Sequence, residues 1–132
     1  MKKNLLRIML AISLMTNVLA TSGCFILALG AAVGAGGIAY VKGALTQKLD
    51  CTIEKVHKAV LKAARDTELF IISDTVNVHN AVLKGEFSED HEKVMIEIES
   101  LTERASQITI RVGVFGDEAR SRMILSAITK RL

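Results

Sequence analysis

Cys24 is the residue whose type and surroundings point most clearly to chemistry. It follows an uncharged stretch, residues 14–23, and the small side chains of Ser22 and Gly23 leave the backbone before it open to a peptidase. A cysteine in this setting accepts acyl groups and becomes the first residue of a lipoprotein once the preceding segment is removed. Thr21 is a departure, because such sites usually carry Leu at that position.

The segment before this cysteine has the order of an export signal. Lys2, Lys3 and Arg7 form a basic start, and an apolar run follows them. We therefore predict a lipoprotein signal peptide over residues 1–23, lipidation of Cys24, and residence in a bacterial cell envelope facing the periplasm.

The acyl groups decide how the chain would be held. Two or more acyl chains attach a protein stably to a membrane, whereas one chain holds it only marginally. Phe25 follows the cysteine, in place of the Asp associated with retention in an inner membrane, so the outer membrane is favoured. The alternative is an uncleaved apolar anchor that contains an incidental cysteine.

The remaining cysteine and the histidines are the other candidates for chemistry. If Cys24 is acylated, Cys51 is a lone thiol in an oxidising compartment, and it lies where a helix start would favour its thiolate. A small semi-buried role is the simpler reading of Cys51, and an intermolecular disulfide is a further alternative. His57 has no metal-ligand residue four positions away. The sequence Asp90-His91-Glu92 places its side chains on adjacent residues, which do not converge on one ion.

We consequently predict no metal, no cofactor and no catalytic residue. The sequence has no nucleophile elbow, phosphate-binding loop or HExxH pattern. The alternative of an envelope enzyme would have to use a shallow pocket at Cys51 or His57.

The net charge argues against nucleic acid as a partner. The chain has 17 basic and 14 acidic residues, which gives +3. Three basic residues and no acidic ones precede Cys24, so the processed chain has 14 of each and a net charge of zero. Aromatic residues make up only 4% of the chain, too few for a stacking platform.

An apolar segment rich in Gly and Ala follows the cysteine. We assign residues 24–39 to a membrane-proximal segment, in which Gly30 and Gly34 have the spacing that lets apolar helices pack closely. A membrane-embedded or interfacial helix, a transmembrane helix if Cys24 is not processed, and a flexible tether are the three readings. Self-association through this segment would make a homo-oligomer and a structural membrane protein.

Residues 40–132 have mixed charged and apolar composition and form the predicted folded domain. Alternation over residues 40–49 predicts one strand, and helical spacing over residues 53–66 predicts a helix capped by Asp50 or Thr52. Further strands are expected at 69–73, 81–87, 92–99 and 106–115, with residues 76–80 ambiguous. The order β-α-β-β-β-β-α predicts an α+β domain, an antiparallel sheet of about five strands with two helices on one face.

The last helix is expected to begin at Asp117 and Glu118, which complement its positive end. Five residues are expected to form its buried stripe: Ala119, Met123, Ile124, Ala127 and Ile128. In the strand before it, Val114 is expected to face inward with Ile108, Ile110 and Val112.

The sheet face away from the helices is the candidate contact surface. Five residues are predicted to lie on it: Lys93, Glu97, Glu99, Thr109 and Arg111. Arg111, Phe115 and Gly116 could line a second binding surface, but packing of Phe115 beneath the final helix is the favoured reading.

The run Arg111-Val112-Gly113-Val114-Phe115-Gly116-Asp117-Glu118, followed by Ser121, Ile124, Ile128 and Leu132, carries a resemblance to a known family. With the Cys24 site, the Gly/Ala segment and Tyr40-Val41-Lys42-Gly43, it resembles a family of short uncharacterised bacterial membrane lipoproteins, classed as a domain of unknown function. The resemblance implies a fold and an envelope location. It implies no activity and no catalytic residues.

Together these patterns predict a lipid-anchored envelope protein that binds or scaffolds, held to the membrane by acylated Cys24. An envelope protein of unknown identity is the expected partner. The structural oligomer and the enzyme remain the alternatives.

Overall fold

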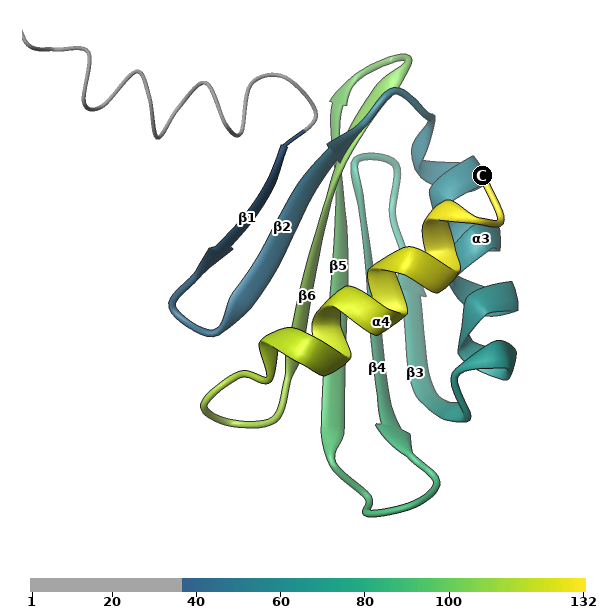
Figure 1. The fold of residues 1–132 in the computed structure, drawn as a ribbon. Coiled ribbons are helices and arrows are strands. Elements are labelled where there is room, and N and C mark those ends of the chain that lie inside the picture. The colour runs from purple at the N-terminus through teal and green to yellow at the C-terminus, as the bar shows by residue number, and fades with distance from the viewer. Residues whose placement is uncertain (1–36) are drawn as a thin grey trace, which may run out of the picture. The chain divides into compact units, whose positions relative to one another are not determined.

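The computed structural model describes residues 37–132, which form an antiparallel sheet of six strands and two helices (Figure 1). The order of strands across the sheet is β1-β2-β6-β5-β4-β3. The elements run β1 (Ile38–Val41), β2 (Ala44–Leu49), α3 (Ile53–Asp66), β3 (Leu69–Val76), β4 (Asn80–Phe87), β5 (Lys93–Thr102), β6 (Ala105–Val112) and α4 (Glu118–Thr129). The predicted α+β class and antiparallel sheet are confirmed.

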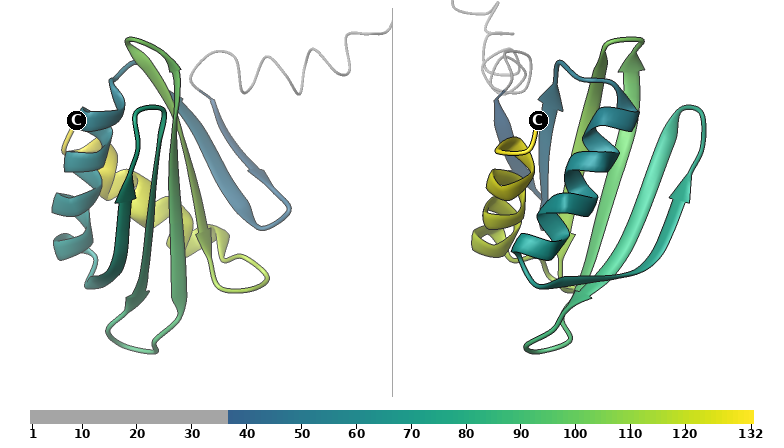
Figure 2. Two further views of the ribbon diagram at one scale, coloured as in Figure 1. Left: turned by 180° about the vertical axis from the view of Figure 1, so that it is seen from behind. Right: turned by 90° about the vertical axis from the view of Figure 1, so that its right-hand side faces the viewer.

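Both helices lie on one side of the sheet, so the domain has two layers (Figure 2). Neither α3 nor α4, the helices within residues 37–132, is long and apolar enough to cross a bilayer. The predicted signal peptide, Cys24 and most of the Gly/Ala segment lie outside the described residues.

The strand count is the first correction, six instead of about five, and the order becomes β-β-α-β-β-β-β-α. The single strand expected over residues 40–49 is a hairpin, because Lys42 and Gly43 both adopt positive φ (51° and 79°). Two consecutive residues in this conformation make the tight turn that reverses a strand. A single strand would place Val41 on the same side as Leu45 and Leu49, but in the hairpin Val41 is exposed while Leu45 and Leu49 are buried. Strand β1 also includes residues 38 and 39, which the prediction assigned to the apolar segment.

The other strands form a meander close to the prediction but longer. Strand β3 extends to Val76, which resolves the ambiguous residues 76–80: the chain turns between Val76 and Asn80, where β4 begins. A β-bulge interrupts the pairing of β3 with β4 between Ile71 and Ser73. Strand β5 runs to Thr102, so the connection to β6 is shorter than expected.

Helix α3 has the predicted bounds, Ile53 to Asp66, and the apolar stripe that its helical spacing predicts is buried: Ile53, Val56, Val60, Ala63 and Ala64. Of the two candidate caps, Thr52 is the N-cap, because its hydroxyl accepts a hydrogen bond from the Lys55 N–H at 3.4 Å. The buried stripe faces the sheet, and the lysines of the helix point outward.

Helix α4 begins as predicted, since Asp117 is its N-cap and accepts a hydrogen bond from the Arg120 N–H at 3.0 Å. Its buried stripe is rotated from the predicted one. Ala119 and Met123 are exposed, and the stripe consists of Ser121, Ile124, Leu125 and Ile128. Ser121 can be buried because its hydroxyl donates to the Asp117 carbonyl at 2.6 Å, which satisfies the polar group.

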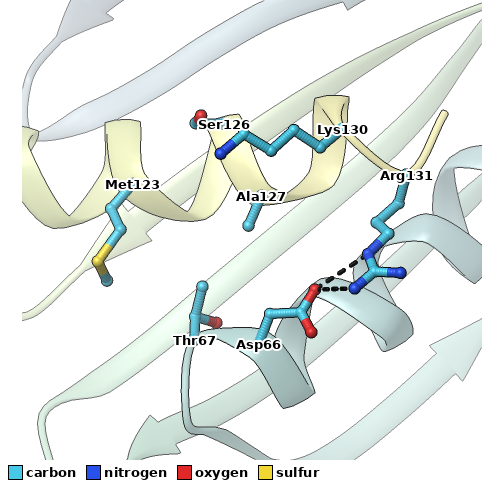
Figure 3. A pocket seen from close by; sticks show the side chains of 7 residues that line it. All are labelled: Asp66, Thr67, Met123, Ser126, Ala127, Lys130 and Arg131. Carbon is cyan, nitrogen blue, oxygen red and sulfur yellow. Dashed lines mark hydrogen bonds and ion pairs between the residues drawn. The ribbon is translucent and has the colours of Figure 1, made fainter.

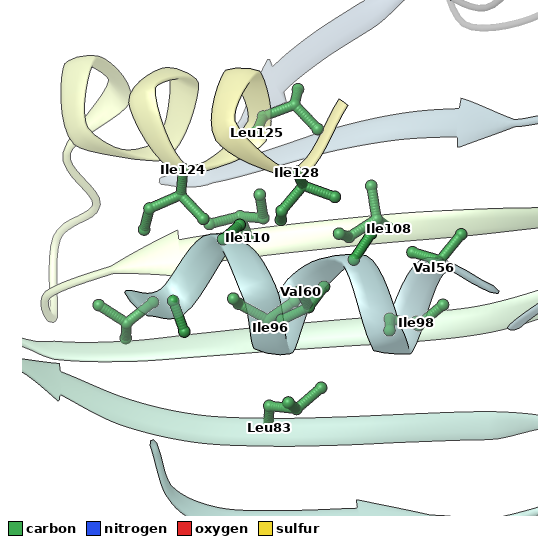
Figure 4. Close-up of a cluster of buried hydrophobic side chains, with 14 of the residues drawn as sticks. Val56, Val60, Leu83, Ile96, Ile98, Ile108, Ile110, Ile124, Leu125 and Ile128 are labelled. Carbon is green, nitrogen blue, oxygen red and sulfur yellow. The ribbon is translucent and has the colours of Figure 1, made fainter. Parts of the chain in front are cut away.

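The hydrophobic core lies between the helix layer and the sheet (Figure 4). The central strands supply every second residue to it. Its largest fully buried side chains include Leu83, Ile96, Ile98, Ile108, Ile110, Ile124 and Ile128. This strict alternation assigns one face of the sheet to the core and leaves the other face free.

The loop between β6 and α4 corrects two further predictions. Strand β6 ends at Val112, and Gly113 adopts a φ of 71°, which turns the chain away from the sheet. Val114 is therefore 85% exposed, not inward-facing, and Phe115 is 94% exposed, not packed beneath the helix. Gly116 (φ 86°) lies against Gly43, and a Cβ on Gly116 would collide with the Gly43 backbone. The loop is thus fixed against the β1–β2 turn.

Candidate binding surface

The sheet face opposite the helices, called here the outer face, carries all five residues that the sequence singled out. Lys93, Glu97 and Glu99 alternate on β5 with the buried Val94, Ile96 and Ile98. Thr109 and Arg111 alternate on β6 with Ile108, Ile110 and Val112. In the β5–β6 register, Thr109 pairs with Glu97 and Arg111 pairs with Met95. The fold therefore gathers these residues on the two central strands.

The outer face is hollowed near the β1–β2 turn. We call this hollow, of about 380 Å³, the basic hollow. It is lined by Ile72, Ser73, Lys84, Gly85, Lys93, Val94, Met95, Arg111 and Gly113. Three of these residues are cationic, none is acidic, and most of the others are apolar.

The strand register explains how residues distant in sequence meet there. Ser73 pairs with Lys84, Lys84 with Met95, and Met95 with Arg111, so these four side chains form one row across the outer face. Lys93 lies two residues before Met95, on the same face. The bulge in β3 inserts Ile72 beside this row, where it lines the hollow.

The cations of the basic hollow have no carboxylate partner within residues 37–132. Neither Lys84 nor Lys93 forms an ion pair in this part of the chain. Arg111 donates from Nη2 to the Lys42 carbonyl at 2.6 Å, which positions the guanidinium without neutralising it. Glu86 is the register partner of Lys93, but its Oε1 lies 3.2 Å from Nδ1 of His91. The hollow consequently carries uncompensated positive charge.

The opposite end of the outer face is polar and acidic. A hollow of about 360 Å³ is lined there by His79, Asn80, Glu97, Ile98, Glu99, Gln107 and Thr109. A smaller hollow of about 210 Å³ lies between the two: it shares Met95 and Arg111 with the basic hollow and Glu97 and Thr109 with the acidic one. The three hollows share lining residues along β5 and β6, and we call them together the furrow, which is positive at one end and negative at the other.

A larger hollow, of about 480 Å³, lies between the C-terminal parts of the two helices (Figure 3). Asp66 of α3 and Arg131, which follows α4, face one another across it, and Arg131 donates to Asp66 Oδ2 from Nη2 at 2.7 Å and from Nε at 3.0 Å. This ion pair joins the two elements and satisfies the charges of Asp66 and Arg131, while Lys130, which also lines the hollow, forms no ion pair within residues 37–132. We therefore regard this groove as a helix contact.

Arg120 is the centre of the main ion-pair cluster in the described domain. Its Nη1 lies 2.7 Å from Asp90 Oδ2 and 2.8 Å from Glu92 Oε2, and its guanidinium lies 4.9 Å from the Phe87 ring centroid. The hydrogen bond from Arg120, helped by the Glu92 N–H, lowers the pKa of Asp90 below its ordinary 3.8, and the same contact raises the pKa of Arg120. The cluster ties the β4–β5 turn to the start of α4.

The two candidates for catalysis, His57 and Cys51, share no hydrogen bond within residues 37–132. His57 Nε2 lies 2.9 Å from both carboxylate oxygens of Asp74, and its hydrogen bonds within residues 37–132 reach that residue alone. An imidazole held by a carboxylate is the arrangement of a general base, but nucleophilic catalysis also needs a hydroxyl or thiol within hydrogen-bonding reach of that imidazole. Cys51 is half-buried, and its carbonyl accepts a hydrogen bond from the Ser106 hydroxyl at 2.9 Å. The described part of the chain contains no group of three metal-ligating side chains.

The second surface considered from the sequence, Arg111 with Phe115 and Gly116, does not form one site. Arg111 lies in the basic hollow, whereas Phe115 projects from the loop and lines none of the hollows described above. Sequence reasoning also missed Ile72, Lys84 and Met95. Met95 follows from strict alternation between Lys93 and Glu97 and could have been found, while Ile72 depends on a bulge that no pattern signals.

One comparison identifies the family of this chain. Residues 4–131 match the family described as "Protein of unknown function (DUF3568)", and the chain belongs to that family. The resemblance to a domain of unknown function is thereby confirmed, and the match adds no activity. No curated protein matches the sequence.

Proposed function

We propose that this protein is a lipid-anchored component of the bacterial envelope that binds another envelope component through the outer face of its sheet. The predicted signal peptide and the residues around Cys24 support the anchor, with the outer membrane favoured by Phe25. The mechanism is tethering. Confinement to a membrane surface raises the effective concentration of the domain for neighbouring molecules, so that a modest contact surface suffices.

The observation that carries the binding role is the basic hollow. The hollow has an apolar lining, and Lys84, Lys93 and Arg111 around it have no ion-pair partner among the described residues. If water alone filled it, apolar surface would stay exposed and the three charges would stay unpaired. Ile72 of the edge strand β3 lines the hollow and is exposed, and Phe70, two residues earlier on the same strand, is also exposed. A partner that covers these groups would remove apolar surface from water and supply the missing negative charge.

The anchor is tested by the intact mass of the protein extracted from its native membrane. We expect a chain that lacks residues 1–23 and carries diacylglyceryl and acyl groups, and we expect this modification to disappear in Cys24→Ser. An unmodified full-length mass would contradict the anchor and make the apolar stretch a membrane segment.

The binding face is tested by a photoreactive amino acid placed at Thr109, on the outer face, and separately at Lys62, on the outward side of α3. Illumination in intact cells should give a discrete crosslinked product from position 109 and none from position 62. Products of equal yield from the two positions would contradict a binding role for the outer face.

A further inference from the structure

We infer that the basic hollow binds a single-chain amphiphile with one anionic head group, namely a long-chain fatty acid. This inference rests on the proposed binding role of the outer face and names its ligand class. Four features carry it: the charge of the hollow, the nature of its lining, the state of the backbone beneath it, and the acidic end of the furrow.

The charge of the hollow selects an anion. Lys84, Lys93 and Arg111 come from three adjacent strands and line one volume, so a single carboxylate can lie near all three. None of them is paired with a carboxylate of residues 37–132. Arg111 is already oriented by its hydrogen bond to the Lys42 carbonyl, which lowers the cost of ordering it.

The lining of the hollow selects an apolar body attached to that anion. Ile72 and Met95 line the hollow together with the two glycines 85 and 113 and with Val94, whose side chain is buried in the core on the other face. Its volume, about 380 Å³, lies within the range of small-ligand sites. The methionine thioether and the long stems of the lysines can follow the shape of an acyl chain.

The backbone beneath the hollow argues against a polypeptide ligand. Of the four strands that line the hollow, β4, β5 and β6 are each paired on both sides, so their N–H and C=O groups are occupied by the sheet, while β3 is an edge strand paired on one side. An extended peptide whose backbone pairs with a sheet does so by adding a strand at an edge, where such groups are free. A peptide lying on this face would leave its own backbone groups unsatisfied over an apolar lining. An acyl chain has no such groups.

The acidic end of the furrow argues against a polyanion. Glu97 and Glu99 lie on β5, on the same face as the cations, and line the neighbouring hollows. A ligand with charge along its whole length would meet these carboxylates and be repelled. A ligand with one anionic head and a neutral tail avoids them.

The test uses the full chain in lipid nanodiscs made of a zwitterionic phospholipid, together with a palmitate analogue that carries a photoreactive diazirine. The corresponding diazirine alcohol, which has the same chain and no charge, is the matched probe. After illumination, mass spectrometry locates the adducts. We expect the acid to label peptides that contain Ile72 or Met95, and we expect the alcohol to label them about fivefold less.

Variants distinguish labelling that depends on the charge of the hollow from general labelling of the protein in the membrane. The double change Lys84→Gln with Lys93→Gln should lower labelling of these peptides by the acid at least about fivefold. Lys48→Gln, on the same face but outside the hollow, should leave it unchanged. Arg111→Gln should act like the double change, but it also removes the bond to Lys42, so the lysine pair decides the result. Circular dichroism establishes that each variant is folded.

Adducts confined to residues 1–36, or equal labelling by acid and alcohol, would overturn the inference. Equal labelling of the wild type and the lysine double variant would also overturn it. If the fatty acid fails while position 109 still gives its crosslinked product, the ligand class is wrong and the binding face stands. If both fail, the proposed function is wrong as well.

Discussion

The two faces of the sheet are made by the same strands and meet different surroundings. On the inner face, Ile96 is 1% exposed beneath the helices, whereas its neighbour Met95, on the outer face, is 38% exposed. The inner face is apolar apart from buried Ser106 of β6, and the outer face combines apolar side chains with cations at one end and carboxylates at the other. A domain needs one buried face for stability, so the composition of the second face is free to serve binding.

The substitutions Ile96→Ala and Met95→Ala compare the inner and outer faces of the sheet most directly. The first change empties part of the core and should lower the free energy of unfolding by about 3 kcal/mol. The second should lower it by less than about 1 kcal/mol, because its site is partly solvated. Denaturant unfolding monitored by circular dichroism measures both. Equal losses would mean that Met95 is packed as well as Ile96, which would require a bound molecule to cover the outer face.

The second prediction concerns the loop that joins the sheet to the helix layer. Gly116→Ala places a Cβ against the Gly43 backbone at a positive φ, and we expect a loss of about 3 kcal/mol. Gly113→Ala is the matched control. It also has a positive φ, but its Cβ would meet only the end of the Glu92 side chain, so a loss of about 1 kcal/mol is expected. Thermal melting of the two variants tests the difference, and similar losses would show that backbone contact adds nothing.

The third prediction concerns acid stability. The pKa of Asp90 is lowered in the folded state, chiefly by Arg120, so the pair stabilises the fold above the ordinary pKa of 3.8. This contribution is lost as the pH falls from about 4 through the lowered pKa. In Arg120→Gln, stability should therefore depend less steeply on pH in this acid range, as measured by melting temperature against pH. The same steepness in both proteins would exclude the Arg120–Asp90 contact as its source.

The smallest effect is expected from the charges of the outer face. Glu97→Gln and Lys93→Gln should each change the free energy of unfolding by less than about 0.5 kcal/mol, since neither side chain forms an ion pair within residues 37–132. Denaturant midpoints provide the measurement. A loss well above this value would indicate that these charges hold the sheet together and are not free for a ligand.

The spacing of apolar residues predicted most of the fold because most segments show either the helical period or the strand period. Helix α3 was predicted with its bounds and buried stripe, since apolar residues recur at helical spacing and Thr52 is a good cap. The β1–β2 hairpin was missed because alternation continues through Lys42 and Gly43, and no Asn-Gly or Asp-Gly pair signals the turn. The α4 stripe was rotated because Ser121 is buried through a hydrogen bond that its residue type does not reveal.

The candidate surface was predictable only in part. The five outer-face residues follow from alternation in β5 and β6, which are central strands of regular register. The basic hollow also needs Lys84 of β4 and Ile72 of β3, and their placement depends on strand order and a bulge. Strand order is decided by packing of the whole chain, so no local sequence pattern predicts it.

The short first strand has a mechanical consequence. Strand β1 has four residues, pairs only with β2, and is the first strand within residues 37–132, which follow the segment that we propose to be anchored. A pull on that segment therefore loads β1 before any other strand. Peeling off residues 38–43 would lengthen the tether by about 20 Å, while β2 stays paired with β6 and the core between sheet and helices stays closed. The hairpin would act as an extensible link that protects the domain from force.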